Sequence, residues 1–381
     1  MIDARTGHVC DVLLTMPSAS VHTVVTSPPY FGLRDYGLPP ARWEDGWVGC
    51  LGLEDTPDQY VEHLCEVFDA TARVLRPDGT LWLNLGDSYA GGGGGNYSKS
   101  RKQTKHGEHV TNVRNRPAWL TAARVKRKDL LGIPWRVAFA LQARGWYLRQ
   151  SIVWHKPNPM PESVTDRCTR AHEMLFMLAH PDSRGRYFYD SFAIREPSVM
   201  KPQRRSKPHK RRVPGRGSTG QAPDTFSTTE ARGEPAQDFP TRNKRDVWTI
   251  APKPFKGAHF AVMPEDLADH CVKAGSSEHG VCAACGTPYK RLVKDASVAA
   301  NQRLVVTETM LSPPSQASAG WGAQCSCAAG VRPAVVLDPF GGAGTVALVA
   351  ARADRDSIYI DASSKYLEGV AKPRWRDEGV L

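Results

Sequence analysis

The chain of 381 residues has no apolar run as long as the roughly 18 residues that a membrane-spanning helix needs. It also lacks a signal peptide at its start, and no internal repeat is visible along its length. We therefore expect a soluble, cytoplasmic protein with no membrane partner.

Acidic residues are scarcer than basic ones. The chain has 39 Asp and Glu against 50 Lys and Arg, which gives a formal net charge of +11 and a pI near 9.2. Residues 201–216 carry eight cations and no acid, and residues 99–128 carry ten cations and one acid. Ordinary solubility would explain the total charge. The clustering in expected loops favours a polyanionic partner, because each neutralised phosphate releases counterions.

The run Val21–Val25 is β-branched and predicts a strand, which ends at Thr26-Ser27-Pro28-Pro29-Tyr30. Open α/β sheets place their chemistry at the carboxyl ends of strands. Two consecutive prolines remove two backbone donors and fix φ, so carbonyls and the Ser27 hydroxyl are left to grip an amino group. The alternative is a Pro-Pro turn with an incidental aromatic residue.

A second motif, Asp338-Pro339-Phe340-Gly341-Gly342-Ala343-Gly344-Thr345, follows an apolar run and precedes a helical one. No Gly-Lys-Ser/Thr ends its glycines, which excludes a P-loop. Glycines allow close approach to a ligand, and a helix N-terminus offers free N–H groups. Asp361, 17 residues past Gly344, stands where nucleotide-binding units carry a ribose-hydroxyl acceptor. These features predict a nucleoside cofactor site, and a dinucleotide remains open on the motif alone.

Only 37 residues follow Gly344, too few for the remaining strands of such a sheet. The missing strands must come from the N-terminal part, so we predict an α/β fold with a circularly permuted sheet. Periodicity further predicts helices at 60–76 and 134–144 and strands at 80–85, 147–155 and 173–178.

The order of the two motifs resembles that of the beta-class S-adenosylmethionine-dependent DNA amino-methyltransferases, in which Ser/Asp/Asn-Pro-Pro-aromatic precedes the glycine loop. Segments 74–87, 145–159 with 172–173, and 247–267 resemble further blocks of that family. The resemblance covers most of residues 1–190 and 245–370. It implies a circularly permuted, Rossmann-like class I methyltransferase sheet with a DNA-recognition insert and a zinc-knuckle insert.

The same resemblance suggests how the chain is divided. Residues 1–190 would form the catalytic half, with a flexible basic loop at 91–130. Residues 191–246 would be a basic target-recognition insert, whose composition is typical of disordered segments. Residues 247–381 would form the cofactor-binding half, with a Cys-rich insert at 271–330.

The resemblance assigns catalysis to Ser27, Pro28, Pro29 and Tyr30. Ser27 Oγ and the Pro28 carbonyl would accept the two amino hydrogens of a flipped base, on which Tyr30 stacks. The methyl group would pass to the amine by direct in-line displacement. Cofactor-binding roles are implied for Asp11, Thr26, Asp338, Phe340, Gly341, Gly342, Gly344, Thr345 and Asp361. Asp11 would accept a hydrogen bond from the adenine amine, and a helix N-cap is its alternative role.

In this family a Ser at the first motif position usually accompanies N4 of cytosine, whereas Asp or Asn accompanies N6 of adenine. Ser27 therefore predicts an N4-cytosine enzyme acting on double-stranded DNA, with N6-adenine as the alternative. A second alternative is a catalytically inactive, zinc-containing DNA-binding protein on the same scaffold. The recognition sequence, and whether the chain is a monomer or a homodimer, are left open.

Nine cysteines in a reducing compartment are not expected to form disulfides. Cys282-x-x-Cys285 and Cys325-x-Cys327 form two knuckles, and four thiolates are a closed structural zinc set. We predict a zinc ion that staples an insert, against DNA or elsewhere, with Cys271 as a substitute ligand and free cysteines as the alternative. The other four are interpreted as packing residues: Cys10, Cys50, Cys65 and Cys168.

Overall fold

The computed structural model describes residues 1–33, 35–90, 103–104, 107–108, 125–198, 241–253, 262–294, 305–306 and 317–381. The basic stretch 201–216 and most of the predicted loop at 91–130 lie outside the described residues. So do residues 295–304 and 307–316 of the predicted Cys-rich insert.

The chain divides into two compact units. The larger comprises residues 1–194, 245–290 and 321–381, and the smaller comprises residues 195–244 and 291–320. The small unit contains an antiparallel pair, β10 (Glu196–Pro197) with β11 (Thr241–Arg242). It also contains most of a three-stranded sheet in the order β15 (Val305–Val306), β14 (Lys290–Lys294) and β16 (Ala317–Gly322).

An eight-stranded sheet forms the centre of the large unit. Its strands, in order across the sheet, are β1 (Ile2–Thr6), β19 (Asp356–Asp361), β18 (Val335–Asp338), β2 (Val21–Thr26), β5 (Leu75–Leu85), β9 (His172–Ala179), β8 (Tyr147–His155) and β12 (Val247–Thr249). β9 is antiparallel to both of its neighbours, and the other pairings are parallel. The carboxyl ends of seven strands therefore meet at one edge.

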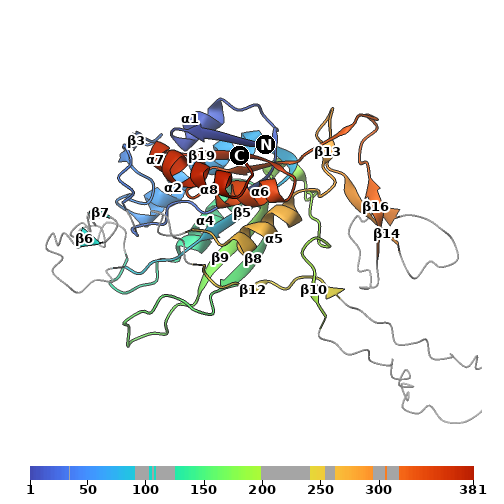
Figure 1. Cartoon of the computed structure of the whole chain (residues 1–381). Coiled ribbons are helices and arrows are strands. Elements are labelled where there is room, and N and C mark those ends of the chain that lie inside the picture. The colour runs from blue at the N-terminus through green and yellow to red at the C-terminus, as the bar shows by residue number, and fades with distance from the viewer. Residues whose placement is uncertain are drawn as a thin grey trace, which may run out of the picture. The chain divides into compact units, whose positions relative to one another are not determined.

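Strands from opposite ends of the sequence interleave in this sheet. β19 and β18 lie between β1 and β2, so the first strand of the chain pairs with one near its end (Figure 1). The sheet around β18, the strand before the glycine loop, is thus completed by strands from the N-terminal part of the chain. The residues after Gly344 are too few to form these strands. The result is a mixed α/β fold around a large sheet.

Helices cover both faces of the sheet. Among the described residues of the large unit, the helical segments are α1 (Val9–Leu14), α2 (Pro57–Val74), α4 (Ile133–Ala143), η1 (Pro181–Ser183), α5 (Glu265–Gly275), α6 (Thr345–Arg352), α7 (Ser364–Tyr366), η2 (Leu367–Ala371) and α8 (Lys372–Asp377). Short strand pairs complete it: β3 (Ala41–Arg42) with β4 (Val48–Gly49), β6 (Gln103–Thr104) with β7 (Gly107–Glu108), and β13 (Val281–Cys282) with β17 (Val331–Arg332).

Successive strand residues face opposite sides of the sheet, as the pleat requires. Val24 packs into a core formed with α1, α2 and α4, whereas its neighbour Val25 packs into a core formed with α5 and α6. Strand β9 alternates in the same way, with Phe176 in the first core and Met177 in the second. Two cores, one on each face, therefore fix the register of these strands.

Some predicted boundaries are wrong: the strand expected at 80–85 is β5, which already begins at Leu75. The helix expected at 60–76 is α2, which begins at Pro57 because Thr56 Oγ1 accepts a hydrogen bond of 3.1 Å from Gln59 N. It ends at Val74, since Leu75 is already extended and opens β5. The strand at 147–155 has the predicted bounds. No helix of the described ranges is long and apolar enough to span a bilayer.

Candidate active site

The two motifs lie side by side at the carboxyl edge of the sheet. β18 and β2 are parallel neighbours, with Leu337 opposite Val24. At their ends, Thr26 Oγ1 donates a hydrogen bond of 2.7 Å to Asp338 Oδ1, joining residues 312 positions apart. Tyr30 and Phe340, one from each motif, pack against the same hydrophobic core. The predicted convergence of the two motifs is confirmed.

Asp338 is a buried carboxyl group at this junction. Burial raises its pKa to about 7, although the hydrogen bonds from Thr26 and from Phe340 N oppose that rise. The Phe340 N–H lies 3.1 Å from Asp338 Oδ1. A buried carboxyl group that titrates near neutrality is suited to meet a cationic group of a ligand.

Asp361 holds the glycine loop in place. Its Oδ2 accepts a hydrogen bond of 2.8 Å from Gly342 N, and its Oδ1 accepts one of 2.7 Å from Ser363 N. Burial raises the pKa of this carboxyl group, and the two backbone donors lower it. Each oxygen keeps a lone pair, so the carboxylate can still accept a hydroxyl hydrogen from a ligand.

Close packing requires glycine at two positions of the loop. A Cβ on Gly341 would lie 2.1 Å from the Tyr359 ring, and one on Gly344 would lie 2.6 Å from Trp375 Nε1. Gly344 also has a φ of +71°, in the left-handed region. The loop is therefore packed closely against two aromatic rings, and residues 341–345 are buried.

Two further residues predicted to bind the cofactor, Thr345 and Asp11, lie on helices α6 and α1. Arg374 Nη1 donates a hydrogen bond of 2.8 Å to Thr345 Oγ1, at the start of α6. Asp11 is exposed in the first turn of α1, whose N-cap is His8, so the capping alternative for Asp11 is wrong. Strand β1, which leads into that helix, pairs its last residue Thr6 with Asp361.

Ser27 and Tyr30 begin a chain of hydrogen bonds. Ser27 Oγ donates to the Tyr30 hydroxyl at 3.2 Å, and the Tyr30 hydroxyl lies 2.7 Å from Glu173 Oε2. It also lies 3.0 Å from Asn84 Oδ1, but its single hydrogen favours the charged acceptor. Burial, and then the charge of Glu173, raise the pKa of Tyr30 well above its ordinary value, so it stays protonated.

Glu173 is held by a cation. Lys156 Nζ donates to Glu173 Oε1, and the same ammonium lies 4.3 Å from the centre of the Trp154 ring. Both side chains are largely shielded, with exposed fractions of 20% for Lys156 and 16% for Glu173. The charge pair is therefore a largely shielded part of this hydrogen-bonded network and not a surface pair.

The Tyr30 ring and the proline corner are fixed by packing. A Cβ on Gly86 would lie 2.6 Å from Tyr30 Cε2, so the ring sits directly against that glycine. Tyr60 OH donates a hydrogen bond of 2.7 Å to the Pro29 carbonyl. The protein itself thus occupies the Pro29 carbonyl and one flank of Tyr30.

Sequence reasoning assigned no role to Asn84, Lys156 or Glu173. Asn84 was detectable, because a polar residue inside the apolar run 81–85 needs a partner. Its Nδ2 donates to the Met174 carbonyl at 3.2 Å. Lys156 and Glu173 follow β8 and open β9, and only the antiparallel pairing of these strands brings them together.

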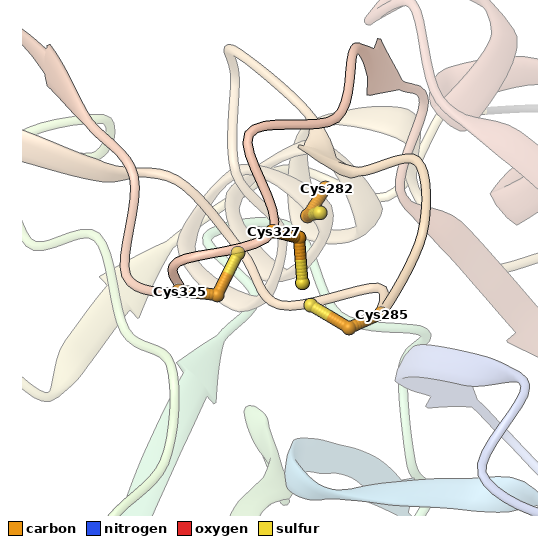
Figure 2. A group of neighbouring side chains, drawn as sticks. All are labelled: Cys282, Cys285, Cys325 and Cys327. Atoms are coloured by element: carbon orange, nitrogen blue, oxygen red, sulfur yellow. The ribbon is translucent and has the colours of Figure 1, made fainter.

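The four predicted metal-ligating cysteines meet in space. The Sγ atoms of Cys282, Cys285, Cys325 and Cys327 all lie within 4.8 Å of one another. Figure 2 shows the four side chains, which come from two separate loops, gathered at one point. None of the nine cysteines forms a disulfide, as predicted.

The structure corrects two other cysteine predictions. Cys271 is buried in α5 and belongs to a hydrophobic core, so it is not a substitute ligand. Cys168 is exposed, so it is not a packing residue. Cys65 is buried and does pack in the core.

Comparison with known proteins gives several matches. A family model for N6/N4 methyltransferases, described as DNA methylase, matches residues 21–283. The type II methyltransferase M.Cfr9I of Citrobacter freundii is 34% identical over 376 residues, which are 98% of the chain and 88% of that protein. M.SmaI of Serratia marcescens is 34% identical over 369 residues, 97% and 88% of the two chains. M.XycI of Xanthomonas campestris pv. cyanopsidis is 41% identical over 274 residues, 72% of each chain.

Proposed function

Because the chain belongs to the N6/N4 DNA methylase family, we propose that it methylates the exocyclic N4 amine of a flipped cytosine in double-stranded DNA, using S-adenosylmethionine. The observation that carries the proposal is the hydrogen bond between Thr26 and Asp338. It joins the motif that would grip an amine to the loop that would bind the methyl donor.

The donor set around the glycine loop fits S-adenosylmethionine. Two carboxyl groups, the buried Asp338 and the partly exposed Asp361, stand beside the glycine loop. We assign Asp338 to the cationic amino group of the cofactor and Asp361 to its ribose hydroxyls. Phe340 and the Gly341–Gly344 backbone would cover the rest, with Thr345 at the helix start. When bound, the cofactor supplies an electrophilic sulfonium methyl group.

The polarity of the Ser27 hydroxyl supports its role as an acceptor. Since Ser27 donates its own hydrogen to Tyr30, its lone pairs remain for an amine hydrogen. The Pro28 carbonyl would accept the second amine hydrogen, because the Pro29 carbonyl is already bound by Tyr60. Two acceptors pull the amine toward a pyramidal nitrogen, whose lone pair is then free to attack. Tyr30 would stack on the base with the ring flank that Gly86 does not cover.

The basic surplus of the chain supports DNA as its partner. The proposed division has a catalytic half at 1–190, a recognition insert at 191–246 and a cofactor half at 247–381. The sheet would be circularly permuted, since β18 and β19 complete strands made at the start of the chain. We also propose one structural zinc ion on the four clustered thiols, because a site of four cysteine ligands is a closed structural set.

Nucleoside mass spectrometry of DNA incubated with enzyme and cofactor tests the proposal. We expect N4-methylcytosine, and its loss in Ser27→Ala by about 100- to 1000-fold, as for the loss of a transition-state hydrogen-bond partner. N6-methyladenine in place of N4-methylcytosine would favour the adenine alternative. DNA binding without any methylated product would favour the inactive, zinc-containing DNA-binding protein.

A further inference from the structure

The cysteine cluster lies against the opposite edge of the sheet from the candidate active site. We infer that the zinc ion, itself part of the proposed function, clamps the amino-terminal ends of β18, β2 and β5 and takes no part in methyl transfer. Hydrogen bonds that link the residues around the cysteine cluster to these three neighbouring strands carry the inference.

His22 links the first knuckle to β2 and β18. Val335 N donates a hydrogen bond of 3.0 Å to His22 Nδ1, so the ring hydrogen is on Nε2. His22 Nε2 then donates to the Gly286 carbonyl at 3.1 Å. One buried imidazole, in the second position of β2, thus bridges the start of β18 and the residue after Cys285.

Arg76 links the same knuckle to β5. Its Nη1 donates a hydrogen bond of 2.9 Å to the Cys285 carbonyl, while its Nε donates to Asp78 at 2.9 Å. A Cβ on Gly286 would lie 2.7 Å from Arg76 Nη1, so the knuckle touches this side chain. Gly286 N in turn donates to the Cys282 carbonyl at 2.9 Å, which closes the turn around the two ligands.

The second knuckle continues directly into the cofactor strand. After Cys327 the chain forms β17, which pairs with β13 and so with Cys282, and then enters β18. The zinc cage has a suitable size, since tetrahedral Zn–S bonds of about 2.3 Å place sulfurs ~3.8 Å apart. One ion would therefore tie both knuckles to the strand that ends in Asp338.

The clamp is distant from the chemistry. His22 is five residues before Ser27 on an extended strand, which corresponds to ~16 Å. Loss of the metal should therefore weaken the fold without removing any group that touches the substrate. This location agrees with a zinc ion that staples structure and takes no part in catalysis, and it places the metal away from the base that Ser27 would bind.

Metal analysis and thermal unfolding of the full chain test the clamp. We expect one zinc ion per chain in the wild type and none in Cys282→Ser or Cys325→Ser, whose Tm falls by about 5–10 °C. Their kcat, measured well below that Tm, should equal that of the wild type. The exposed Cys168→Ser is the matched control and should keep both zinc and Tm.

The outcomes separate the claims. A wild type without zinc would overturn the metal and the clamp while leaving the methyltransferase proposal intact. Bound zinc whose removal by a chelator leaves Tm unchanged would overturn the clamp alone. An unchanged Tm with lost DNA binding would assign the metal to the DNA interface instead.

If the cysteine variants fold poorly, chelation of zinc in a single-residue variant tests the clamp instead. In an Arg76→Met background, chelation of zinc should lower Tm by clearly less than in the wild type, because one link is already cut. Arg73→Met is the control, since Arg73 donates to the Met16 carbonyl at 2.9 Å, away from the knuckle. Equal Tm losses in all three proteins would contradict a clamp acting through Arg76.

A separate observation, the hydrogen-bond chain at Ser27, carries a second inference. We propose that Glu173, fixed by Lys156, receives the proton that the methylated amine must lose. The new N–C bond leaves an extra proton on nitrogen; it passes to Ser27 Oγ as the Ser27 hydrogen moves to Tyr30 and the Tyr30 hydrogen to Glu173. Every donor in the chain already points toward the carboxylate.

Single-turnover rates test this path. Glu173→Gln should lower the rate by roughly 10- to 100-fold with little change in KM, and Glu173→Asp should restore part of it. Tyr30→Phe keeps the ring but cuts the path, so adding Glu173→Gln to it should cost little more. Additive losses, or a change confined to KM, would contradict the path. Glu62→Gln, which breaks an exposed pair with Arg144, is the control.

Discussion

Thr26 and Asp338, 312 residues apart in the chain, share a hydrogen bond of 2.7 Å at adjoining strand ends. The Thr26 hydroxyl lowers the pKa of a carboxyl group that burial raises. This contact holds together the motif at residues 26–30 and the glycine loop, so its strength should be measurable as stability and, on the proposed function, as cofactor affinity.

Replacement of Thr26 by the similarly shaped valine should destabilise the fold. We expect Thr26→Val to cost about 1–3 kcal/mol at pH 8, where the hydrogen bond has a charged acceptor, and less at pH 5. Urea unfolding at both pH values measures it. Thr15→Val, which loses a bond to the Val12 carbonyl on an exposed helix end, should cost under about 0.5 kcal/mol. Equal losses at both pH values would contradict the assigned role.

The pKa of Asp338 makes stability depend on pH. The pKa of Asp338 is about 7 in the folded protein and near the ordinary value of 3.8 in the unfolded chain. The neutral carboxyl group therefore contributes its full stabilisation of the ligand-free fold only below about pH 4. That contribution, on the order of 4 kcal/mol at most, is lost as the pH rises toward 7. Unfolding of wild type and Asp338→Asn between pH 5 and 8 should reveal a slope that only the wild type has.

Cofactor affinity should show the opposite trend. A cationic amino group favours ionised Asp338, so binding should tighten by up to about eightfold between pH 6 and pH 7.5. Isothermal titration with S-adenosylmethionine measures this change. Asp338→Asn should bind weakly at every pH, and a pH-dependence that survives in this variant would assign the titration to another group.

An added methyl group on Gly86 should displace Tyr30. The new Cβ would lie 2.6 Å from the ring, so the ring must move away from its bonds to Ser27 and Glu173. We expect Gly86→Ala to lower kcat by roughly 100-fold, the effect of a misplaced catalytic group. Gly369→Ala, whose Cβ meets nothing within 4 Å, is the control and should keep full activity.

The basic stretch 201–216 should set the salt dependence of DNA binding. Glutamine at Arg204, Arg205, Arg211 and Arg212 should lower the slope of log K against log salt by up to about 0.9 for each lost phosphate contact. Fluorescence anisotropy between low and high salt gives the slope. The rate of methylation at saturating DNA should be unchanged in this variant. Arg144→Gln is the control and should keep the wild-type salt slope, because Arg144 is paired with Glu62.

Much of the fold is readable from local sequence. Apolar and β-branched runs before Thr26 and Asp338 predicted two strands, and their polar ends predicted where the site would form. Parallel pairing at one sheet edge explains why this inference succeeds, because both motifs occupy the same structural position after a strand.

The rest depends on strand order, which local pattern does not contain. Glu173 reaches Tyr30 only because β9 runs antiparallel beside β5. The residue pattern of 172–179 predicts a strand, but it does not predict which strand is its neighbour. The cysteine spacing predicted the four ligands but not where in the fold they lie. His22 and Arg76, which contact the first knuckle, are more than 200 residues from it in the sequence. The end of α2 was missed because Leu75 and Arg76 continue its composition.

The insertion of β18 and β19 between β1 and β2 has a consequence for biosynthesis. While the ribosome is still translating the middle of the message, β1 and β2 have emerged but the two strands that separate them do not yet exist. Nascent β2 therefore has one flank unpaired through most of translation, and an unpaired strand edge favours aggregation. Premature termination before residue 335 should yield a polypeptide that lacks the proposed methyl-donor site and is therefore inactive.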